Sequence, residues 1–227
     1  ILESRLYSAV SKAGPAAETA SEASFLDQLA AGTATPGGGS AAAFTGAAAA
    51  GLVAMVGRLT VGRKKYVAVE SQMWALVEQA EALRTELTRA VERDSAAFLD
   101  IMAAMKLPKD TEEQQVTRSG EIEKATRQAM QVPLEVGRMA VQVMELALQA
   151  ASVGNLNAIT DAASGAALAR AALTAAGLNV RTNSVSLQEP SFAVPMLEVV
   201  QRLEAQASNI EQQLRSVLID RGHLPLA

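Results

Sequence analysis

The sequence predicts an all-α protein, a bundle of about six helices, two of them long, and three observations support this. Of the 227 residues 49% are hydrophobic but only 3% are aromatic, so Ala and Leu supply most of the apolar content. Apolar residues recur at helical spacing through most of the chain. No segment alternates apolar and polar residues convincingly, as a half-buried strand would. A chain of this length and composition can bury a sizeable core.

The same composition excludes several classes of function. The chain has no cysteine and one histidine, which rules out disulfides, a thiolate nucleophile and the usual zinc sites. No metal site is predicted, because a metal would need carboxylates alone. A net charge of −4 and few aromatic residues argue against binding to nucleic acid or to an anionic membrane surface. The chain shows no secretory signal, so the default location is the cytoplasm.

Two regions are expected along the chain. Residues 1–23 are predicted to be a linker, or the tail of an upstream domain, because residues 8–24 are rich in small and polar residues without a hydrophobic period. The first residue of the sequence is Ile1 and not a methionine, which also suggests an upstream segment. The folded helical domain is expected at residues 24–227.

The domain begins with a short helix and an Ala/Gly-rich one. The short helix, 25–31, would follow Ser24 as its N-cap and end at Gly32. The second, 41–59, would be capped by Ser40. This second helix is nearly uncharged and about as long as a short membrane span. Its Ala and Gly content and the basic residues after it favour a helix at the centre of a bundle or at a subunit interface.

Two long helices follow. Hydrophobic residues near a seven-residue spacing predict a helix over 69–105. After a short break, Asp110 or Thr111 can cap a helix that runs to about residue 152. Pro133 falls inside it and is expected to kink it.

The last part of the chain predicts a second small-residue helix and an amphipathic one. A turn at 154–157 leads to helix 158–176, which Gly177 would close. Residues 178–190 are expected to form an irregular connection, and a final amphipathic helix spans about 192–220. The two small-residue helices predict a homodimer that buries one of them.

Asp94 is the most informative single residue. It lies where the apolar period of helix 69–105 predicts a hydrophobic side chain, so its carboxylate should point into the interior or a cleft. A buried carboxylate needs a partner or a task. General acid/base chemistry or a substrate contact is one explanation, and a salt bridge to an arginine of a neighbouring helix is the other.

Four polar groups are candidates for ligand binding. A glycine triplet before helix 41–59 offers backbone N–H groups to an anion, although a hinge explains it too. A basic run beside an aromatic ring can clamp a carboxylate or be a solvated helix end. The start of helix 158–176 has more polar residues than capping needs. Three further polar residues, in the connection 178–190, would project together if that segment is extended. In order, the groups are Gly37, Gly38, Gly39 and Ser40; Arg63, Lys64, Lys65 and Tyr66; Asn155, Asn157 and Asp161; and Asn179, Arg181 and Asn183.

In this order the motifs resemble the formiminotransferase-cyclodeaminase family, over about residues 24–220. One departure is Leu156, where the family often has proline. The segments that carry the resemblance include Thr35-Pro36-Gly37-Gly38-Gly39-Ser40, Thr60-Val61-Gly62-Arg63-Lys64-Lys65-Tyr66, Asp94-Ser95-Ala96-Ala97-Phe98, Gly154-Asn155-Leu156-Asn157-Ala158, Thr160-Asp161-Ala162 and Leu178-Asn179-Val180-Arg181-Thr182-Asn183.

The resemblance implies a homodimeric, all-helical enzyme that acts on a one-carbon-substituted tetrahydrofolate, expected to be polyglutamylated. Formimidoyltetrahydrofolate cyclodeaminase is the first expectation, because the linker at the start suggests a fused or associated formimidoyltransferase. Methenyltetrahydrofolate cyclohydrolase is the alternative, and a non-catalytic helical scaffold is the rival of another class. Neither reaction requires a metal or a cofactor beyond the folate substrate.

The resemblance also implies roles for the candidate residues. Asp94 and Asp161 would supply acid/base chemistry or bind the pterin. Arg63, Lys64 and Lys65 would hold glutamate carboxylates. The glycine triplet and Ser40 would give the ligand access to the backbone, and the other polar candidates would contact substrate, namely Tyr66, Asn155, Asn157, Asn179, Arg181 and Asn183.

Overall fold

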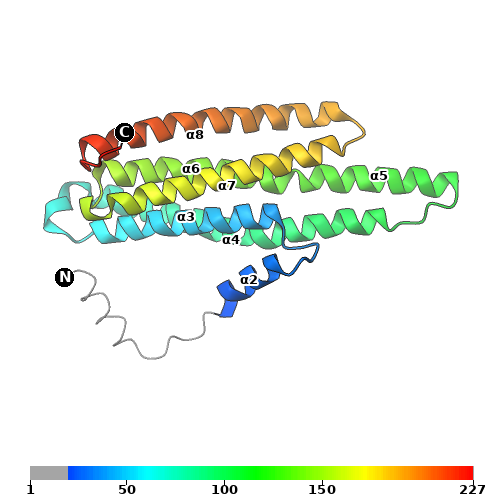
Figure 1. The fold of residues 1–227 in the computed structure, drawn as a ribbon, viewed down its shortest axis with the longest axis horizontal. Coiled ribbons are helices and arrows are strands. Elements are labelled where there is room, and N and C mark those ends of the chain that lie inside the picture. The colour runs from blue at the N-terminus through cyan, green and yellow to red at the C-terminus, as the bar shows by residue number, and fades with distance from the viewer. Residues whose placement is uncertain (1–19, 227) are drawn as a thin grey trace. The chain divides into compact units, whose positions relative to one another are not determined.

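Residues 20–226 are described in the computed structural model, and every regular element among them is helical (Figure 1). The predicted all-α class is confirmed. The chain divides into two units, Ile1–Thr35 and Pro36–Ala227. The first holds α2 (Ala20–Ala30). The second holds α3 (Gly38–Thr60), α4 (Glu70–Met105), α5 (Glu112–Ala129), α6 (Gln131–Val153), α7 (Ile159–Val185) and α8 (Val194–Asp220), with short 3-10 helices η1 (Lys64–Val69), η2 (Leu156–Ala158) and η3 (Pro190–Ala193).

Helix α3 lies at the centre of the second unit and packs against α4, α7 and α6. Small residues allow this close packing. A Cβ added at Gly57 would lie 2.6 Å from Val77 of α4, and one at Gly165 of α7 would lie 3.2 Å from the Ala49 carbonyl oxygen. Larger side chains on the surrounding helices, such as Met73, fill the remaining core, and each contributes about 1.5–3 kcal/mol by burial.

By length and composition α3 is the one helix of the described residues that could cross a membrane. More than half of its most apolar stretch, 56%, is buried by the neighbouring helices. Its apolar surface is therefore used largely inside the bundle, as the sequence predicts for a central helix.

The other helices form a second layer and a protruding hairpin. Helix α8 lies along α6 and α7 (Figure 1). Helices α4 and α5 pair with each other and extend past the start of α3. Thr111 caps α5 in a capping box with Gln114, as expected. The final amphipathic helix is confirmed as α8, with η3 leading into it.

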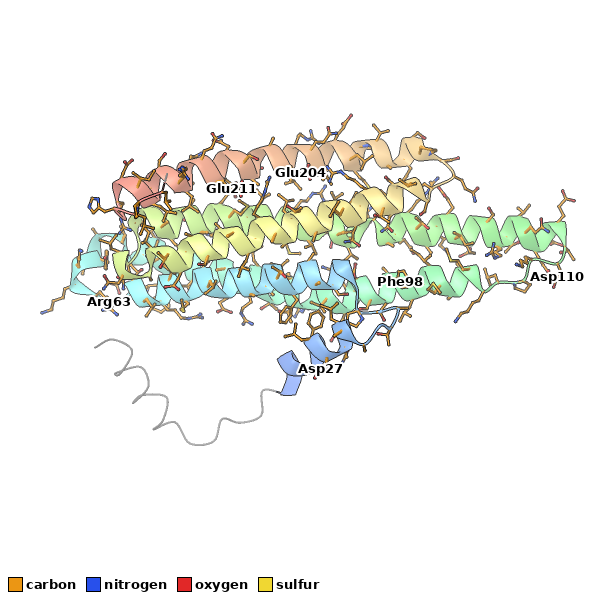
Figure 2. All side chains as sticks on the ribbon, in the orientation of Figure 1. Asp27, Arg63, Phe98, Asp110, Glu204 and Glu211 are labelled. Atoms are coloured by element: carbon orange, nitrogen blue, oxygen red, sulfur yellow. The ribbon has the colours of Figure 1, made fainter. Side chains whose placement is uncertain are left out.

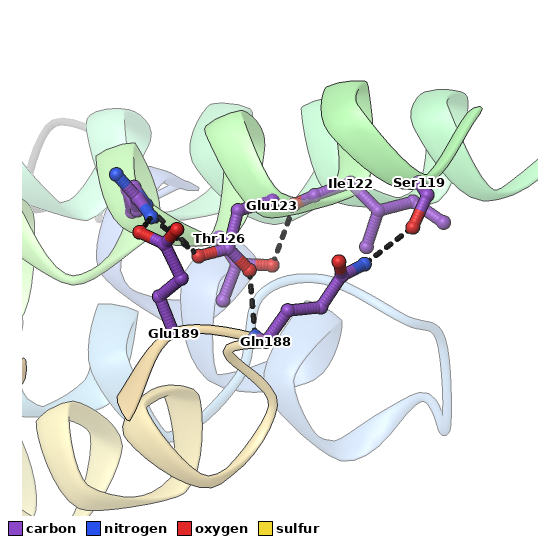
Figure 3. A network of polar contacts seen from close by, with 7 residues as sticks. Ser119, Ile122, Glu123, Thr126, Gln188 and Glu189 are labelled. Carbon is purple, nitrogen blue, oxygen red and sulfur yellow. Dashed lines mark hydrogen bonds and ion pairs between the residues drawn. The ribbon is translucent and has the colours of Figure 1, made fainter. Parts of the chain in front are cut away.

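The connection between α7 and α8 is fastened to α5 (Figure 3). The Gln188 backbone N–H donates to Glu123 Oε2 at 2.8 Å, and the Gln188 side-chain amide donates to Ser119. Arg127 of α5 pairs with Glu189 at 2.6 Å and with Glu123 at 2.9 Å. These contacts hold the connection after α7 against α5.

The start of the folded region differs from the prediction at both helices. Helix α2 begins at Ala20, inside the predicted linker, so Ser24 lies within the helix and is not its N-cap. The rest of the linker lies outside the described residues. Gly32, at a φ of +73°, follows the end of α2 as expected. Helix α3 begins at Gly38, with Gly37 as N-cap residue, so the cap predicted at Ser40 is also wrong.

The predicted kink at Pro133 is also wrong. The chain breaks one turn earlier, between α5 and α6 at Met130, and Pro133 lies in the first turn of α6, where a missing N–H is tolerated. The Ala129 carbonyl, which has no N–H to accept from Pro133, instead accepts a hydrogen bond from Asn183 Nδ2 at 3.2 Å. A side chain of α7 thus compensates for the proline.

The irregular connection predicted at 178–190 is largely helix. Helix α7 continues through Gly177 to Val185. Gly177 serves packing and does not end the helix, because a Cβ there would lie 3.1 Å from Val200 of α8. The buried side of α7 also extends beyond the glycine, to Val180. Helical burial overrides the local stop signal that a glycine gives.

Candidate functional site

Asp94 lies against the first turn of α3. Its Oδ2 is 2.8 Å from Ser40 Oγ, and the Ser40 backbone N–H also donates to the carboxylate. An acidic group at this position complements the partial positive charge of a helix N-terminus. Asp94 is half-buried, as its place in the apolar period of α4 predicts. Within the described residues it forms no ion pair, and the neighbouring Arg93 pairs with Glu135 at 2.7 Å. The salt-bridge alternative is therefore not realised.

Glycine at position 39 is what allows Asp94 to come so close. A Cβ added at Gly39 would lie 2.1 Å from Asp94 Oδ1, far inside van der Waals contact. Asn179 of α7 borders the same turn, because its Nδ2 lies 3.4 Å from a Cβ placed at Gly38. Gly38, Gly39, Ser40, Asp94 and Asn179 therefore meet, and this group of residues is called the Asp94 site below.

Two opposing effects set the charge of Asp94. Burial raises the pKa of its carboxyl above the usual range, while the hydrogen bonds from the Ser40 hydroxyl and backbone N–H pull the pKa back down. A carboxyl whose pKa is moved toward neutrality can take and return a proton during a reaction. The site thus offers an acid/base group beside a helix N-terminus.

The second group of predicted residues lies at the opposite end of α3 and forms a structural lock. The Asn155 backbone N–H donates to Thr60 Oγ1 and its side-chain Nδ2 donates to the Leu59 carbonyl oxygen, both at 2.8 Å. Tyr66 accepts a hydrogen bond from the Leu156 N–H at 2.9 Å. Asn155 is buried, at 5% exposure. These contacts tie the α6–α7 turn to the end of α3, and we call them the Asn155 lock.

The basic run beside the lock is open to solvent. Arg63, Lys64 and Lys65 are exposed. Arg63 Nε donates to the Leu59 carbonyl oxygen at 2.8 Å, which suits a cation at a helix C-terminus. Lys65 lies 5.6 Å from the centre of the Tyr66 ring. Figure 2 shows Arg63 at this end of the bundle and Phe98, one turn after Asp94 on α4, toward the other.

Within one chain the two ends of α3 do not form one site. Helix α3 has 23 residues, so at 1.5 Å per residue its ends are about 33 Å apart. Asp161 belongs to the end with the lock, half-buried in the first turn of α7, and Asn157 is exposed near it. The structure therefore separates Asp161 from Asp94.

The three polar residues of the expected extended connection lie on helix α7 and point to different neighbours. Arg181 forms a two-bond ion pair with Glu204 of α8, at 2.9 and 2.8 Å. Asn183 bonds the Ala129 carbonyl. Of the three, Asn179 alone borders the Asp94 site. The expectation that all three project together is wrong, because residues two apart on a helix point in different directions. Arg181 faces α8, whereas Asn179 and Asn183, one turn apart, face the start of α3 and the end of α5.

Sequence reasoning missed two residues that the structure brings into these clusters. The Ser95 hydroxyl lies 3.1 Å from Ser40 Oγ. Its place directly after a half-buried aspartate was the available signal. Thr60 is almost fully buried at 1% exposure, and a polar residue in the apolar helix α3 was the signal there. Within residues 20–226 no three Asp, Glu or His side chains gather in a way that could hold a metal ion.

Comparison with known proteins decides the family. A sequence model of the family described as formiminotransferase-cyclodeaminase matches residues 21–202. This chain belongs to the formiminotransferase-cyclodeaminase family. The resemblance found in the sequence is confirmed.

Relatives in this family carry two different names. A methenyltetrahydrofolate cyclohydrolase of Methylorubrum extorquens is 42% identical over 84% of this chain and 91% of its own length. A formimidoyltransferase-cyclodeaminase of Rattus norvegicus is 33% identical over 76% of this chain, which spans about a third of that longer protein. The crystal structure of a formiminotetrahydrofolate cyclodeaminase from Thermotoga maritima matches with a TM-score of 0.77 and 31% identity, over 86% of this chain and 93% of that one.

Proposed function

We propose that this family member is an enzyme of one-carbon folate metabolism, a 5,10-methenyltetrahydrofolate cyclohydrolase that produces 10-formyltetrahydrofolate. The observation that carries the proposal is the Asp94 site, a half-buried carboxyl with a raised pKa at a helix start where Gly38 is exposed. The 42% identity to a cyclohydrolase of similar length supports this hydrolysis over the cyclodeamination of formimidoyltetrahydrofolate.

The hydrolysis needs one group that moves protons. The Asp94 carboxylate takes a proton from water as the water oxygen bonds to the cationic methenyl carbon. When the bond from that carbon to folate N5 breaks, Asp94 returns its proton to N5. The hydroxyl on the carbon becomes the formyl oxygen and releases its proton to solvent. Water is the nucleophile and the substrate is already a cation, so no metal or other cofactor is part of this proposal.

Cyclodeamination of formimidoyltetrahydrofolate is the second candidate, and the sequence alone favours it first. The similarity to the Thermotoga structure supports it. Folate N10 would attack the formimidoyl carbon, and Asp94 would carry the N10 proton to the nitrogen that leaves as ammonia. A fused or associated formimidoyltransferase would belong to this alternative, and the cytoplasm suits either reaction.

One experiment separates the two reactions. Purified protein is given each folate in turn, and methenyl absorbance and ammonia are followed. If the proposal is right, methenyltetrahydrofolate loses its methenyl absorbance when the protein is added, and a metal chelator does not change the rate. Release of ammonia from the formimidoyl substrate at a higher kcat/KM would replace it with the second candidate. No turnover of either folate would favour a non-catalytic scaffold.

The proposed enzyme is a homodimer built over α3 and α7. Helix α7 has no charged residue on its solvent side, and α3 beside it exposes Leu59 and half-exposes Leu52. Exposed apolar side chains with no charge between them, such as Leu168 and Leu178, are typical of a surface that another chain covers. The solvent-facing residues of α7 are Thr160, Ser164, Ala167, Leu168, Ala171, Thr174, Leu178, Thr182 and Val185.

A dimer also brings the two ends of α3 together. A two-fold axis perpendicular to α3 lays the end of one α3 beside the start of the other. Lys64 and Lys65 would then approach the partner's Asp94 site and could hold the glutamate tail of its substrate. A two-fold axis along α3 would instead place the two basic runs together, which repulsion disfavours.

Size and mixing experiments test the dimer. Light scattering at micromolar concentration should give twice the chain mass, and Leu178→Glu should give monomers, while Val116→Glu, on exposed α5, should not.

Mixed dimers of Asp94→Asn with the double variant Lys64→Ala/Lys65→Ala should regain one site with wild-type KM, since that site takes Asp94 from one chain and lysines from the other. Absence of that site would return the lysines to their role as a solvated helix end.

A further inference from the structure

Ser40 was expected to offer its backbone to a ligand, but the whole residue is buried at 0% exposure and its backbone N–H donates to Asp94. Its Oγ has three polar neighbours. They are Asp94 Oδ2 at 2.8 Å, Ser95 Oγ at 3.1 Å and the Val91 carbonyl oxygen at 3.2 Å. A hydroxyl has one proton to donate and two lone pairs to accept with. The charged Asp94 carboxylate and the Val91 carbonyl can only accept, whereas the Ser95 hydroxyl can accept or donate, so the Ser40 proton has more than one possible position.

We propose that the Ser40 hydroxyl is a positioning group that follows the protonation state of Asp94, donating to the carboxylate when Asp94 is charged and to the Val91 carbonyl when Asp94 carries the proton. The inference rests on the proposed role of Asp94 as proton carrier and deepens it. In the second state the Asp94 O–H donates to Ser40 Oγ across the same 2.8 Å. The carboxyl therefore keeps its place while it gains and loses a proton.

Ser95 completes both arrangements. When Ser40 donates to the carboxylate, its oxygen can accept from the Ser95 hydroxyl, whose oxygen is 3.1 Å away. When Ser40 donates to Val91, its two lone pairs accept from Asp94 and Ser95 together. Each state leaves every hydroxyl proton with an acceptor, so the change of state does not leave a buried polar atom unpaired.

Other charged groups around the site have partners of their own. On α4 Arg93 pairs with Glu135 of α6, and on α7 Arg181 pairs with Glu204. On α5 Arg127 pairs with Glu123 and Glu189. The one charged residue of α3, Arg58, lies in the last turn of that helix, far from Asp94, and pairs with Glu81 of α4. Among these described groups, Ser40 is the direct hydrogen-bonding control on the charge of Asp94.

The test uses Ser40→Ala, with Thr88→Ala as a matched control, because Thr88 is an exposed hydroxyl on α4 that bonds only its own helix. The carboxyl titration of Asp94 is followed by NMR without substrate and assigned with Asp94→Asn. Loss of a hydrogen bond to a charged group should move the titration midpoint up by about one pH unit or more. The acid limb of kcat/KM should move with it, and kcat should fall about 10-fold with KM little changed.

A second variant covers the case in which Ser40→Ala fails to fold. Ser95→Ala, at a half-exposed position, should shift the same midpoint in the same direction by less. An unchanged Asp94 titration in whichever of the two variants folds, or a rise in KM alone, would overturn the proposal. If the titration shifts but Asp94→Asn keeps wild-type turnover, Ser40 does position Asp94 and the proposed function is what fails.

Discussion

The two ends of α3 carry similar polar residues but do different work. At its start, the Asp94 carboxyl is half-buried, has a raised pKa and borders Gly39 in the first turn of the helix. At its end, Asn155, Thr60 and Tyr66 use their polar atoms on backbone groups of the neighbouring turn. Polar residues whose hydrogen bonds are all spent on the fold hold it together, whereas a carboxyl held in a costly environment is available for chemistry.

The largest expected effect is from Asp94→Asn, which keeps the shape but cannot carry a proton. We expect kcat to fall about 10²-fold or more while folate binding persists. The raised pKa of Asp94 also fixes the sign of its effect on stability. The contribution of Asp94 to the free energy of unfolding is fully present below its pKa in the unfolded state, and it is lost as the pH rises through its pKa in the folded state. At neutral pH Asp94→Asn should therefore be as stable as the wild type or more so. Turnover assays and thermal unfolding measure the two effects.

Wild-type turnover in Asp94→Asn would remove the contrast between the two ends. A variant that unfolds and binds no folate would instead make Asp94 a structural residue. In the wild type, activity should fall as the pH drops through the raised pKa of Asp94, because the proton acceptor is then lost.

The next effect concerns the space beside Asp94. Gly39→Ala should lower kcat by up to about 10²-fold, because its Cβ displaces the carboxylate and misplacement by 1 Å can have an effect of that size. Gly37→Ala is the matched control, since a Cβ there meets nothing within 4 Å. Equal kcat in the two variants would show that the position of Asp94 does not matter.

A smaller effect is expected at the basic run. Lys64→Ala or Lys65→Ala should raise KM about 10-fold, and more for polyglutamylated than for monoglutamylated substrate, with weaker salt dependence afterwards. Steady-state kinetics with both substrates at two ionic strengths measure this. The same KM ratio between the two substrates in wild type and variant would leave these lysines as a solvated helix end.

The smallest effect on activity is expected at the Asn155 lock. Asn155→Ala removes two hydrogen bonds at a buried position and should lower the free energy of unfolding by about 1–3 kcal/mol, and Tyr66→Phe by about 0.5–1.5 kcal/mol. Both should keep kcat near wild type at temperatures where they are folded. Denaturant unfolding and turnover assays check this. A loss of kcat without a loss of stability would make this end part of the catalytic site.

The sequence by itself determined the all-α class, the position of α4, the capping of α5 and the burial of Asp94. Each follows from local rules: apolar residues repeat at the helical period, and a carboxylate inside that period must turn inward. The family resemblance also came from motifs read along the chain. Ser40, as a partner of Asp94, lies 54 residues away, and no local rule joins the two.

Only the tertiary structure decided where helices stop and which polar residues meet. Gly177 and Pro133 gave local signals for an end and a kink, but packing against Val200 and the hydrogen bond from Asn183 to Ala129 overrode both. The length of α3 likewise separates the basic run from Asp94 within one chain, although the resemblance assigned both to one folate substrate. Local patterns fix the face and the period of a helix, whereas contacts between distant segments set its length and its neighbours, because that is where most burial energy is gained.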